Sequence, residues 1–571
     1  MKTVLSRFAS KREGLADFRT CLRGLVTTAF LCAGVLSAAE PELVGHWKLA
    51  ADARDSSGNG LHAVNHGVEF ADGAAAFNGR DAYLEVADGD RLRPGNGDFT
   101  ISLWVHTEEK LDDVLGDLLS KFDPDTRTGA VLSIMNYPGV TNAQSNHRNL
   151  FFGIDANTPP SAWEDLGRPG DCRHIRSLCV YEGNLYASTW EPAAEGAGGV
   201  YRFEGKGNWV HVGPPEQANA VSCLCVCDGK LYAASEWYDG GGSSLPLSEN
   251  TNPGGRVWRY DGGTSWTDCG RVDEEVTSVS GLVEFNGELY AGTGTTGRHH
   301  PMGKNKGLYR YLGGTQWESL GCPGKRTVHL GVYNGNIYAL SYDGGHVLRY
   351  DGDGKWTDFG VPPETSQTYS FMVYDGKMHF CTWPNALLVR NEGPGEWTVL
   401  GRPGEEKESM AVSLYNGKLY IGTLPLAEVY RYDGPDRLTH VGRLDHTPDV
   451  VYRRAWAMAV YGGKLYCGVL PSGHVFRLEA GKSVSHDRGL EPGWRHVAVV
   501  RDGGALRLYV DGKCVAKNQG FDADRFNLDN ENPLKIGFGP HDYFNGRMKD
   551  VRIYAGALGE TAIAEAASLT P

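Results

Sequence analysis

The sequence predicts an all-β protein that combines a closed ring of seven four-stranded units with a two-sheet β-sandwich. Three observations predict this fold. A ten-residue hairpin pattern, written LYNGKLYIGT from Leu414, occurs seven times between residues 180 and 469. Gly is abundant, at 77 of 571 residues, and apolar residues alternate with period 2 in short runs. A different strand pattern stands at both ends of the chain, so more than one domain is expected.

The first 39 residues have the layout of a cleaved secretory signal. Basic residues precede a twelve-residue, largely apolar run from Leu25 to Leu36, and Ser37-Ala38-Ala39 places small residues where a signal peptidase cuts. Twelve residues are short for a membrane-spanning helix. We therefore expect cleavage after Ala39 and a secreted protein, extracellular or periplasmic, with no membrane span.

Charge and cysteine content narrow the classes of function. The formal net charge of −14 argues against nucleic acid or an anionic membrane surface as a partner. Ten of the twelve cysteines follow the predicted signal, too few for a disulfide scaffold of this length. Cys223, Cys225 and Cys227 alternate along one strand without a second metal half-site, so we expect buried core residues. Cys269 and Cys322 occupy matching places in neighbouring repeats and are the pair expected to form a disulfide.

Each repeat predicts four strands. A strand with apolar alternation leads into the hairpin, a third element carries an Arg between apolar or aromatic residues, and a fourth usually begins with Trp. The hairpin glycines recur every 41 to 58 residues, at Gly183, Gly229, Gly287, Gly335, Gly376, Gly417 and Gly463. The arginines are Arg202, Arg259, Arg310, Arg349, Arg390, Arg431 and Arg477. A four-stranded unit of this length is typical of a β-propeller blade, and seven equivalent arginines indicate a structural role, bonding loop carbonyls or stacking on Trp.

The number of outer strands predicts how the ring closes. Seven hairpins are followed by only six outer strands, and the seventh appears before the first hairpin, where AWEDLGRPG around Trp163 matches EWTVLGRPG around Trp397. We expect the segment at Trp163 to complete the last blade.

The flanking strands resemble the laminin-G-like, concanavalin-A-like jelly roll found in many secreted bacterial proteins. The motifs upstream are D-x-S-G-x-G from Asp55, F-x-G-x-x-x-Y-L from Phe77 and F-T-I-S-x-W from Phe99. Those downstream are W-x-H-V-A from Trp494, L-Y-V-D-G from Leu508 and F-x-G-x-x-x-D-V-R-I-Y from Phe544. The resemblance covers most of residues 43–156 and 486–571. It implies a jelly roll in two halves, 40–156 and 486–571, with a kelch-like propeller at 157–485 inserted into one of its loops.

Candidate ligand-binding residues lie where the repeats differ, in the segments that follow each hairpin. Large aromatic residues and acids recur there, and the connections into the next blade share the same face of a propeller. The candidates are Trp190, Glu191, Glu236, Trp237, Tyr238, His299, His300, Tyr342, Asp343, Trp383, Arg453 and Arg454. Aromatic rings beside carboxylates suit a carbohydrate, although the same rings could instead cover blade edges.

Two functions follow from different classes. The first is a secreted, monomeric binding protein for a glycan or an extracellular protein, with a lectin-like jelly roll. The alternative is a glycoside hydrolase or lyase acting on polysaccharide, with catalytic residues drawn from Glu191, Glu236, Asp239, His299, His300 and Asp343. No motif assigns a catalytic role to any of these residues.

The jelly-roll resemblance also implies a possible Ca²⁺ at the rim of the sandwich. Asp55 and Asp550, one in each half, are the candidate ligands because calcium prefers carboxylate oxygens. Alternatively, Asp55 forms a turn with the Ser-Ser-Gly that follows it, and Asp550 pairs with an Arg.

Overall fold

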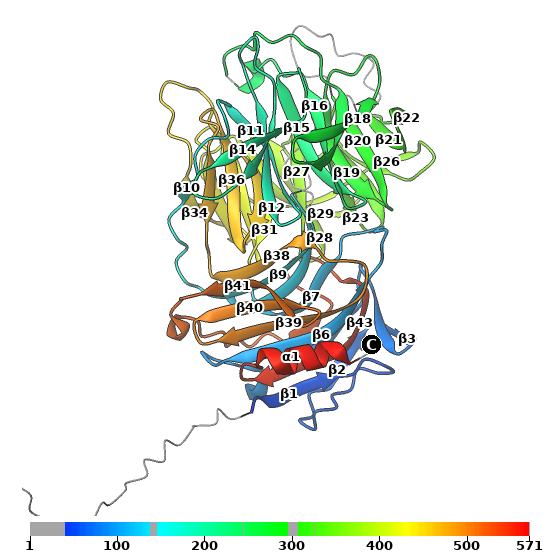
Figure 1. Cartoon of the computed structure of the whole chain (residues 1–571), viewed down its shortest axis with the longest axis vertical. Helices are drawn as coiled ribbons and strands as arrows, with labels where there is room; N and C mark the ends of the chain where they lie inside the picture. Colours follow the sequence, from blue (N-terminus) through cyan, green and yellow to red (C-terminus); the bar gives the residue numbers. More distant parts are fainter. Residues whose placement is uncertain (1–39, 138–144, 244, 295–306, 325, 570–571) are drawn as a thin grey trace, which may run out of the picture. The chain divides into compact units, whose positions relative to one another are not determined.

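A computed structural model describes residues 40–137, 145–243, 245–294, 307–324 and 326–569 (Figure 1). Within these residues there are 43 strands, three short 3-10 helices and one α-helix, α1 (Glu560–Ser568). The 3-10 helices are η1 (Asp90–Leu92), η2 (Gly241–Ser243) and η3 (Ala523–Arg525). The protein is therefore all-β, as predicted.

Seven four-stranded antiparallel units are built from the repeats in the described residues. Each leads from an inner strand through the hairpin to two outer strands. Units one to three are β11 (His174–Tyr181), β12 (Asn184–Trp190), β13 (Val200–Phe203), β14 (Trp209–Gly213); β15 (Ala220–Cys227), β16 (Lys230–Glu236), β17 (Arg256–Gly262), β18 (Ser265–Arg271); β19 (Val279–Phe285), β20 (Glu288–Thr293), β21 (Leu308–Gly313) and β22 (Gln316–Gly321). Units four and five are β23 (Thr327–Tyr333), β24 (Asn336–Ser341), β25 (Val347–Tyr350), β26 (Trp356–Asp358); β27 (Gln367–Tyr374), β28 (Lys377–Trp383), β29 (Leu388–Gly393) and β30 (Glu396–Gly401). Units six and seven are β31 (Glu408–Tyr415), β32 (Lys418–Leu424), β33 (Glu428–Gly434), β34 (Arg437–Arg443); β35 (Arg454–Tyr461), β36 (Lys464–Leu470), β37 (Val475–Leu478) and β10 (Glu164–Asp165).

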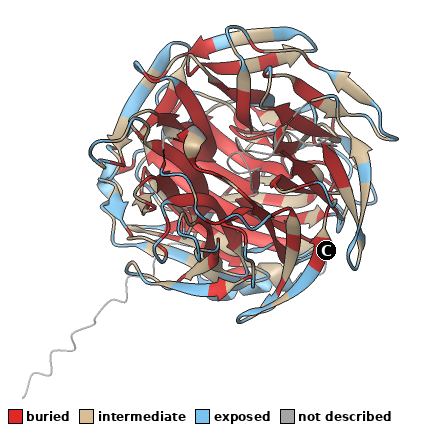
Figure 2. Cartoon of the chain, turned by 90° about the horizontal axis from the view of Figure 1, so that it is seen from above, coloured by how far each residue is buried: buried red, intermediate tan, exposed pale blue. Residues whose placement is uncertain are grey.

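These units form a closed propeller. Each inner strand contacts the inner strand of the next unit, and β11 contacts both β15 and β35. The predicted closure is confirmed, because β10 pairs with β37 through Glu164 opposite Arg477 and Asp165 opposite Phe476. Figure 2 shows buried residues concentrated toward the centre of the ring and exposed residues toward its rim. One unit alone could not bury both of its faces, whereas a ring of seven can.

Two further sheets contain strands from both ends of the chain. One has β1 (Glu42–Trp47), β3 (Glu69–Ala71), β4 (Ala74–Asn78), β6 (Phe99–Thr107), β39 (Gly493–Asp502), β40 (Ala505–Val510), β41 (Lys513–Gln519) and β43 (Asn545–Ala555). The other has β2 (Ala63–His66), β5 (Tyr83–Val86), β7 (Gly116–Asp123), β8 (Thr128–Tyr137), β9 (Asn146–Ala156), β38 (Lys482–Gly489) and β42 (Leu534–Ile536). One apolar core, which includes Trp47, Ile101, Phe152 and Val499, joins residues of the two sheets into a sandwich.

The predicted long-range pairing near Phe99 and Trp494 is confirmed. β6 and β39 are antiparallel, with Phe99 opposite Arg501 and His106 opposite Trp494. In Figure 1 the blue β6 lies beside the orange β39, although almost 400 residues separate them in sequence.

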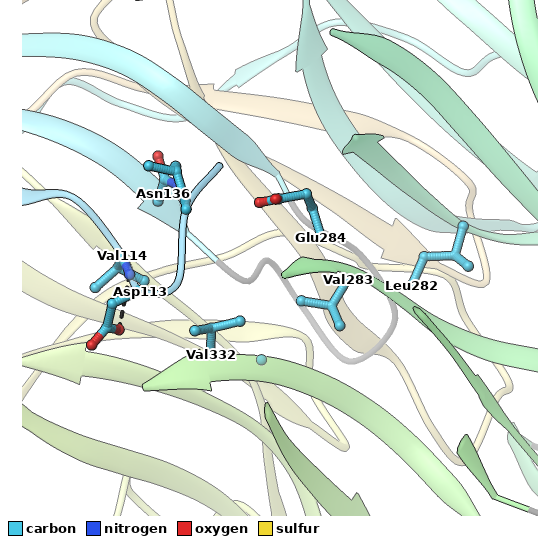
Figure 3. Close-up of a pocket in the computed structure, with 9 residues that line it drawn as sticks. Asp113, Val114, Asn136, Leu282, Val283, Glu284 and Val332 are labelled. Carbon is cyan, nitrogen blue, oxygen red and sulfur yellow. Dashed lines mark hydrogen bonds between the residues drawn. The ribbon is translucent and has the colours of Figure 1, made fainter. Parts of the chain in front are cut away.

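The repeated hairpin turns contact residues of the sandwich. The backbone N–H of Gly335 donates to Asp113 Oδ2 at 3.0 Å, and that of Asn286 donates to Leu111 O at 2.8 Å. A small cavity of about 20 Å³ lies here. Figure 3 shows Asp113 and Glu284 among the residues that line it. The hairpins thus lie at one end of the blades, and the variable segments that follow them lie at the other.

The seven repeated arginines are structural, but their partners differ from the prediction. Arg259, for example, donates to the carboxylate of Asp261, two residues later, at 3.1 Å. Thr267 on the next strand donates to the same carboxylate at 2.6 Å. The other six also bind a Glu or Asp, by two-residue spacing in Arg202, Arg349, Arg390 and Arg431 and by contacts across strands in Arg310 and Arg477. Carboxylates, rather than loop carbonyls or Trp rings, hold the guanidinium groups, because an ionised acceptor forms the stronger hydrogen bond.

The predicted disulfide between Cys269 and Cys322 is wrong, since neither residue forms one. Cys269 packs in a cluster with Tyr309 and Val279, whereas Cys322 packs against Leu308 and Leu330 in a different cluster. The two thiols therefore belong to separate apolar layers and do not meet. Cys223, Cys225 and Cys227 are buried, as predicted.

Candidate binding site on the propeller

Aromatic residues from the variable segments meet at one end of the ring. Trp190, Tyr369 and Trp456 are buried in one apolar cluster, and six partly buried rings pack against it. Trp209 and Tyr461 lie on strands β14 and β35, whereas the other four lie in the variable segments and the connections between blades: Tyr238, Tyr342, Trp383 and Tyr452. Four of the predicted site residues, Trp190, Tyr238, Tyr342 and Trp383, are thus brought together from four different blades. We call the set of four partly buried rings, Tyr238, Tyr342, Trp383 and Tyr452, the aromatic cluster.

A β-bulge in each inner strand underlies this arrangement. The pairing register shifts at the same place in all seven inner strands, for example between Ile175 and Ser177 and between Ala455 and Ala457. An extra residue at a bulge is left out of the ladder, which re-aims its side chain. In these strands the residues left out include Arg176, Ser222, Ser280, Tyr369, Ser370, Met410 and Trp456.

Side chains at the bulges bridge adjacent blades. The indole N–H of Trp456 donates to the carbonyl of Arg176 at 3.1 Å, and the hydroxyl of Ser370 donates to the carbonyl of Met410. These bonds satisfy backbone carbonyls that the ladder has left free. The bulges are therefore held in place by the neighbouring blade.

Arg176 forms a buried ion pair beneath the aromatic cluster. Its guanidinium donates to the carboxylate of Glu236, and the two side chains are 5% and 2% exposed. The same guanidinium lies over the rings of Tyr238, at 5.2 Å, and Trp456, at 5.3 Å. Cation–π contacts of this kind stabilise both the charge and the ring orientation.

Arg454 forms a second buried charge pair. Its guanidinium is 3.9 Å from Glu408 Oε2 and donates to Ser243 Oγ at 2.8 Å. It also lies 5.6 Å from the centre of the Trp456 ring. Burial raises the pKa of Glu408, an effect that the charge of Arg454 opposes. Trp456 thus separates two arginines, each with a carboxylate partner.

A third arginine lies closer to solvent. Arg326 donates two hydrogen bonds to Asp343, at 2.8 and 2.7 Å, in a bidentate pair. Its guanidinium lies 3.9 Å from the centre of the Tyr342 ring, and Tyr342 packs edge-on against Tyr369. The guanidinium of Arg326 and the ring of Tyr369 together hold the Tyr342 ring in its orientation.

The long segment after β16 supplies part of the site. Trp237 is buried and donates from its indole N–H to Asn250 O at 2.8 Å. The Tyr238 hydroxyl shares a hydrogen bond with Ser243 Oγ, at 2.5 Å, and Ser243 in turn accepts from Arg454. Trp237 therefore anchors the segment, while Tyr238 and Ser243 reach the buried arginines.

Other predicted residues do not join the aromatic cluster. Trp190 is fully buried, so its ring supports Tyr238, 6.0 Å away, and offers no surface to a ligand. Arg453 donates to the carbonyl of Thr447 at 2.6 Å. Burial, with the charge of Asp171, raises the pKa of Glu191 to about 7. His299 and His300 lie outside the described residues.

The candidate calcium ligands are engaged elsewhere. Asp55 accepts hydrogen bonds from the backbone N–H groups of His46, Ser57 and Leu61 at 2.8 to 3.0 Å. Asp550 Oδ1 contacts His46 Nε2 at 2.7 Å and accepts from Arg552 at 2.9 Å. The described part of the chain contains no group of three or more acidic, His or Cys side chains placed to hold a metal. Both carboxylate oxygens of Asp55 and Oδ1 of Asp550 are thus engaged by protein groups, as in the alternative of a turn at Asp55 and an Arg partner for Asp550.

Sequence reasoning missed Glu408, Trp456, Ser243 and Arg326. The sequence does contain a signal for Trp456. Each inner strand has one position, five residues before its final aromatic or Cys residue, at which the residue type differs widely from repeat to repeat. That position holds Arg176, Ser222, Ser280, Tyr369, Met410 and Trp456 among others. The β-bulges explain why the residues at this position lie at the site, and the bulges are not visible in the sequence.

Part of the chain is similar to a known protein family. Residues 459–564 match the Laminin_G_3 family, described as the concanavalin A-like lectin/glucanases superfamily. The match begins in β35 and ends in α1. The comparison with curated proteins finds no match. Among the described residues, no helix is long and apolar enough to span a membrane.

Several solved structures are similar. One is a virginiamycin B lyase from Staphylococcus aureus, with 12% identity and a TM-score of 0.42, covering 55% of this chain and 98% of that chain. Another is the WD40 β-propeller domain of Doa1, with 11% identity and a TM-score of 0.36, covering 57% and 97%. A third is Saccharomyces cerevisiae Sqt1, with 12% identity and a TM-score of 0.34, covering 67% and 99%. The propeller assignment itself follows from the strand pairing described above.

Proposed function

We propose that the protein is a secreted binding protein for a glycan, and that the aromatic cluster on the propeller is its binding surface. The observation that carries the proposal is the convergence of Tyr238, Tyr342, Trp383 and Tyr452, all partly exposed, from separate blades. Sugar C–H faces stack on such rings, while hydroxyls take directional hydrogen bonds from nearby polar groups.

The charges around the cluster favour an uncharged glycan. Arg176, Arg326 and Arg454 are paired with the carboxylates of Glu236, Asp343 and Glu408, respectively. The six groups are balanced in charge, so a polyanion would gain little net attraction. Paired arginines and carboxylates still present donors and acceptors in fixed directions, which suits sugar hydroxyls.

We also propose the domain organisation on which this function rests. Residues 1–39 would be the secretory signal, 40–156 and 486–571 the two halves of a lectin-like jelly roll, and 157–485 an inserted, kelch-like propeller. Support comes from the pairing of β6 with β39 and of β9 with β38, which joins strands from before and after the repeats.

A binding assay with matched variants tests the proposal. The protein would be screened on an array of neutral and acidic oligosaccharides, and the best ligand titrated against Tyr342→Ala, Trp383→Ala and Trp494→Ala. Trp494 is a partly exposed aromatic residue of the sandwich, so it serves as the control. We expect the two propeller variants to lose about tenfold or more in affinity, since stacking contacts contribute on the order of 1 kcal/mol or more.

Other outcomes would separate the alternatives. Loss of binding in Trp494→Ala alone would place the glycan on the sandwich and refute a propeller site. Release of reducing ends or unsaturated sugars by the purified protein would establish the enzyme alternative. No binding to any oligosaccharide would exclude the proposed ligand class.

A further inference from the structure

A separate pocket of about 350 Å³ lies between the two sheets of the sandwich. One wall comes from β1, β6 and β43, and the other from β7, β8 and β42. Its apolar lining includes Val44, Phe99, Ile101, Leu119, Leu534 and Ile553. An engineered apolar cavity of about 150 Å³ holds one benzene molecule, and ligand pockets in proteins commonly begin near 300 Å³. This pocket is therefore large enough for a small organic molecule.

Two small residues, Gly129 and Ala130, line the pocket. A Cβ atom at Gly129 would lie 2.0 Å from the carbonyl oxygen of Lys121, so the backbone there requires glycine. Ala130 has no such restriction and is buried among larger apolar residues of the core. A larger side chain at Ala130 would extend into the pocket. An unfilled cavity lowers the stability of the folded state, so the small residue at this position has a cost.

Each of the three basic residues that line the pocket is paired with an acid. Lys121 and Arg93 both donate to Asp88, and Arg91 donates to Glu42 at 2.7 Å. Asp90 and Asp98 also line the pocket. The three cations are thus opposed by the four acids Glu42, Asp88, Asp90 and Asp98. An anionic ligand would meet acidic side chains and no surplus of cations.

We propose that this pocket binds an uncharged apolar molecule, such as a two-ring aromatic compound or an aliphatic chain of similar volume. The apolar walls supply the binding free energy, because burial of an apolar ligand recovers contacts that the empty pocket lacks. The acidic surplus at the rim excludes anions of the same shape. This site is independent of the aromatic cluster on the propeller.

The test uses the full chain and two fluorescent probes of similar size. N-phenyl-1-naphthylamine is uncharged, whereas 8-anilinonaphthalene-1-sulfonate carries a negative charge. We expect the uncharged probe to bind saturably with an increase in fluorescence, and to bind at least about tenfold more tightly than the anionic probe.

Filling the pocket supplies the control for location. Ala130→Leu and, from the opposite sheet, Val44→Phe should each weaken binding of the uncharged probe by about tenfold or more. Ala51→Leu adds the same side chain at an exposed position and should leave binding unchanged. Thermal unfolding identifies any variant that fails to fold. If one of the two filled variants fails to fold, the other is enough to test the location of the probe. The proposal is overturned if the wild-type protein does not bind the uncharged probe, if a folded filled variant binds it as the wild type does, or if the anionic probe binds equally well.

Discussion

The guanidinium of Arg176 on β11 and the carboxylate of Glu236 on β16 form an ion pair that joins the first and second blades of the propeller. Both side chains are almost completely buried. Removing one member of such a pair leaves an uncompensated charge away from water, whereas replacing both removes the charges together. The pair therefore links the stability of the ring to the geometry of the proposed binding surface.

The first prediction concerns this ion pair. Arg176→Met should lower the free energy of unfolding by roughly 3 to 5 kcal/mol, because the buried carboxylate of Glu236 would lose the guanidinium of Arg176. The double variant Arg176→Met/Glu236→Gln should regain much of that loss. Urea unfolding measures both. Equal stability of the wild type and Arg176→Met would show that the pair has no structural role.

The second prediction concerns pH. Burial raises the pKa of Asp113, from 3.8, and that of Glu284, from 4.5, in each case to about 7. The folded state therefore binds protons more tightly than the unfolded state. Their contribution to stability is fully present below the unfolded pKa values, near 4, and is lost as the pH rises to about 7. The loss is at most roughly 3 to 4 kcal/mol per residue.

Matched variants isolate this effect from other titrating groups. Asp113→Asn/Glu284→Gln should lose less stability than the wild type between pH 4 and pH 7.5, as measured by urea unfolding across that range. Parallel pH profiles for the two proteins would contradict the assignment.

The third prediction concerns the dependence of the sandwich on both ends of the chain. Residues 160–484 alone should fold as a cooperative β-propeller. Residues 40–156 alone should not fold, because β6 and β9 would lack their partners β39 and β38 and expose open edges. Joining 40–156 to 481–571, which keeps the whole of β38, through a short Gly/Ser linker should restore a folded sandwich. Circular dichroism and thermal unfolding measure each fragment, and a stable 40–156 fragment would refute the inserted arrangement.

The fourth prediction concerns metal. Asp55 and Asp550 hold protein donors in place of an ion, so EGTA should leave the melting temperature unchanged. A fall of several degrees on chelation, reversed by added Ca²⁺, would require a calcium site elsewhere in the chain.

Sequence pattern was sufficient for the strands but not for the centre of the site. The hairpins around Gly183 and its equivalents, the closing strand near Trp163 and the pairing of Phe99 with the Trp494 strand depend on local periodicity and on repeat counting, which are legible in one sequence. The meeting of Trp456 with Arg176 depends instead on bulges that change the strand register. The carboxylate partners of the repeated arginines were also not predicted, although in five blades the acid stands two residues after the arginine. Arg310 binds Glu318 across the hairpin, whereas Arg259 binds Asp261 within its own strand.

The pairing of β10 with β37 in the seventh blade has a consequence for a chain that has been cleaved once by a protease. Cleavage in a connection between two middle blades would produce two pieces, one ending and one beginning at the cut. The first piece carries β10, β6 and β9, and the second carries β37, β39 and β38. Because these strands pair with one another, both pieces would remain hydrogen-bonded in three separate sheets. A nicked molecule would therefore persist as a single particle until it is denatured, which is an advantage in surroundings that contain proteases.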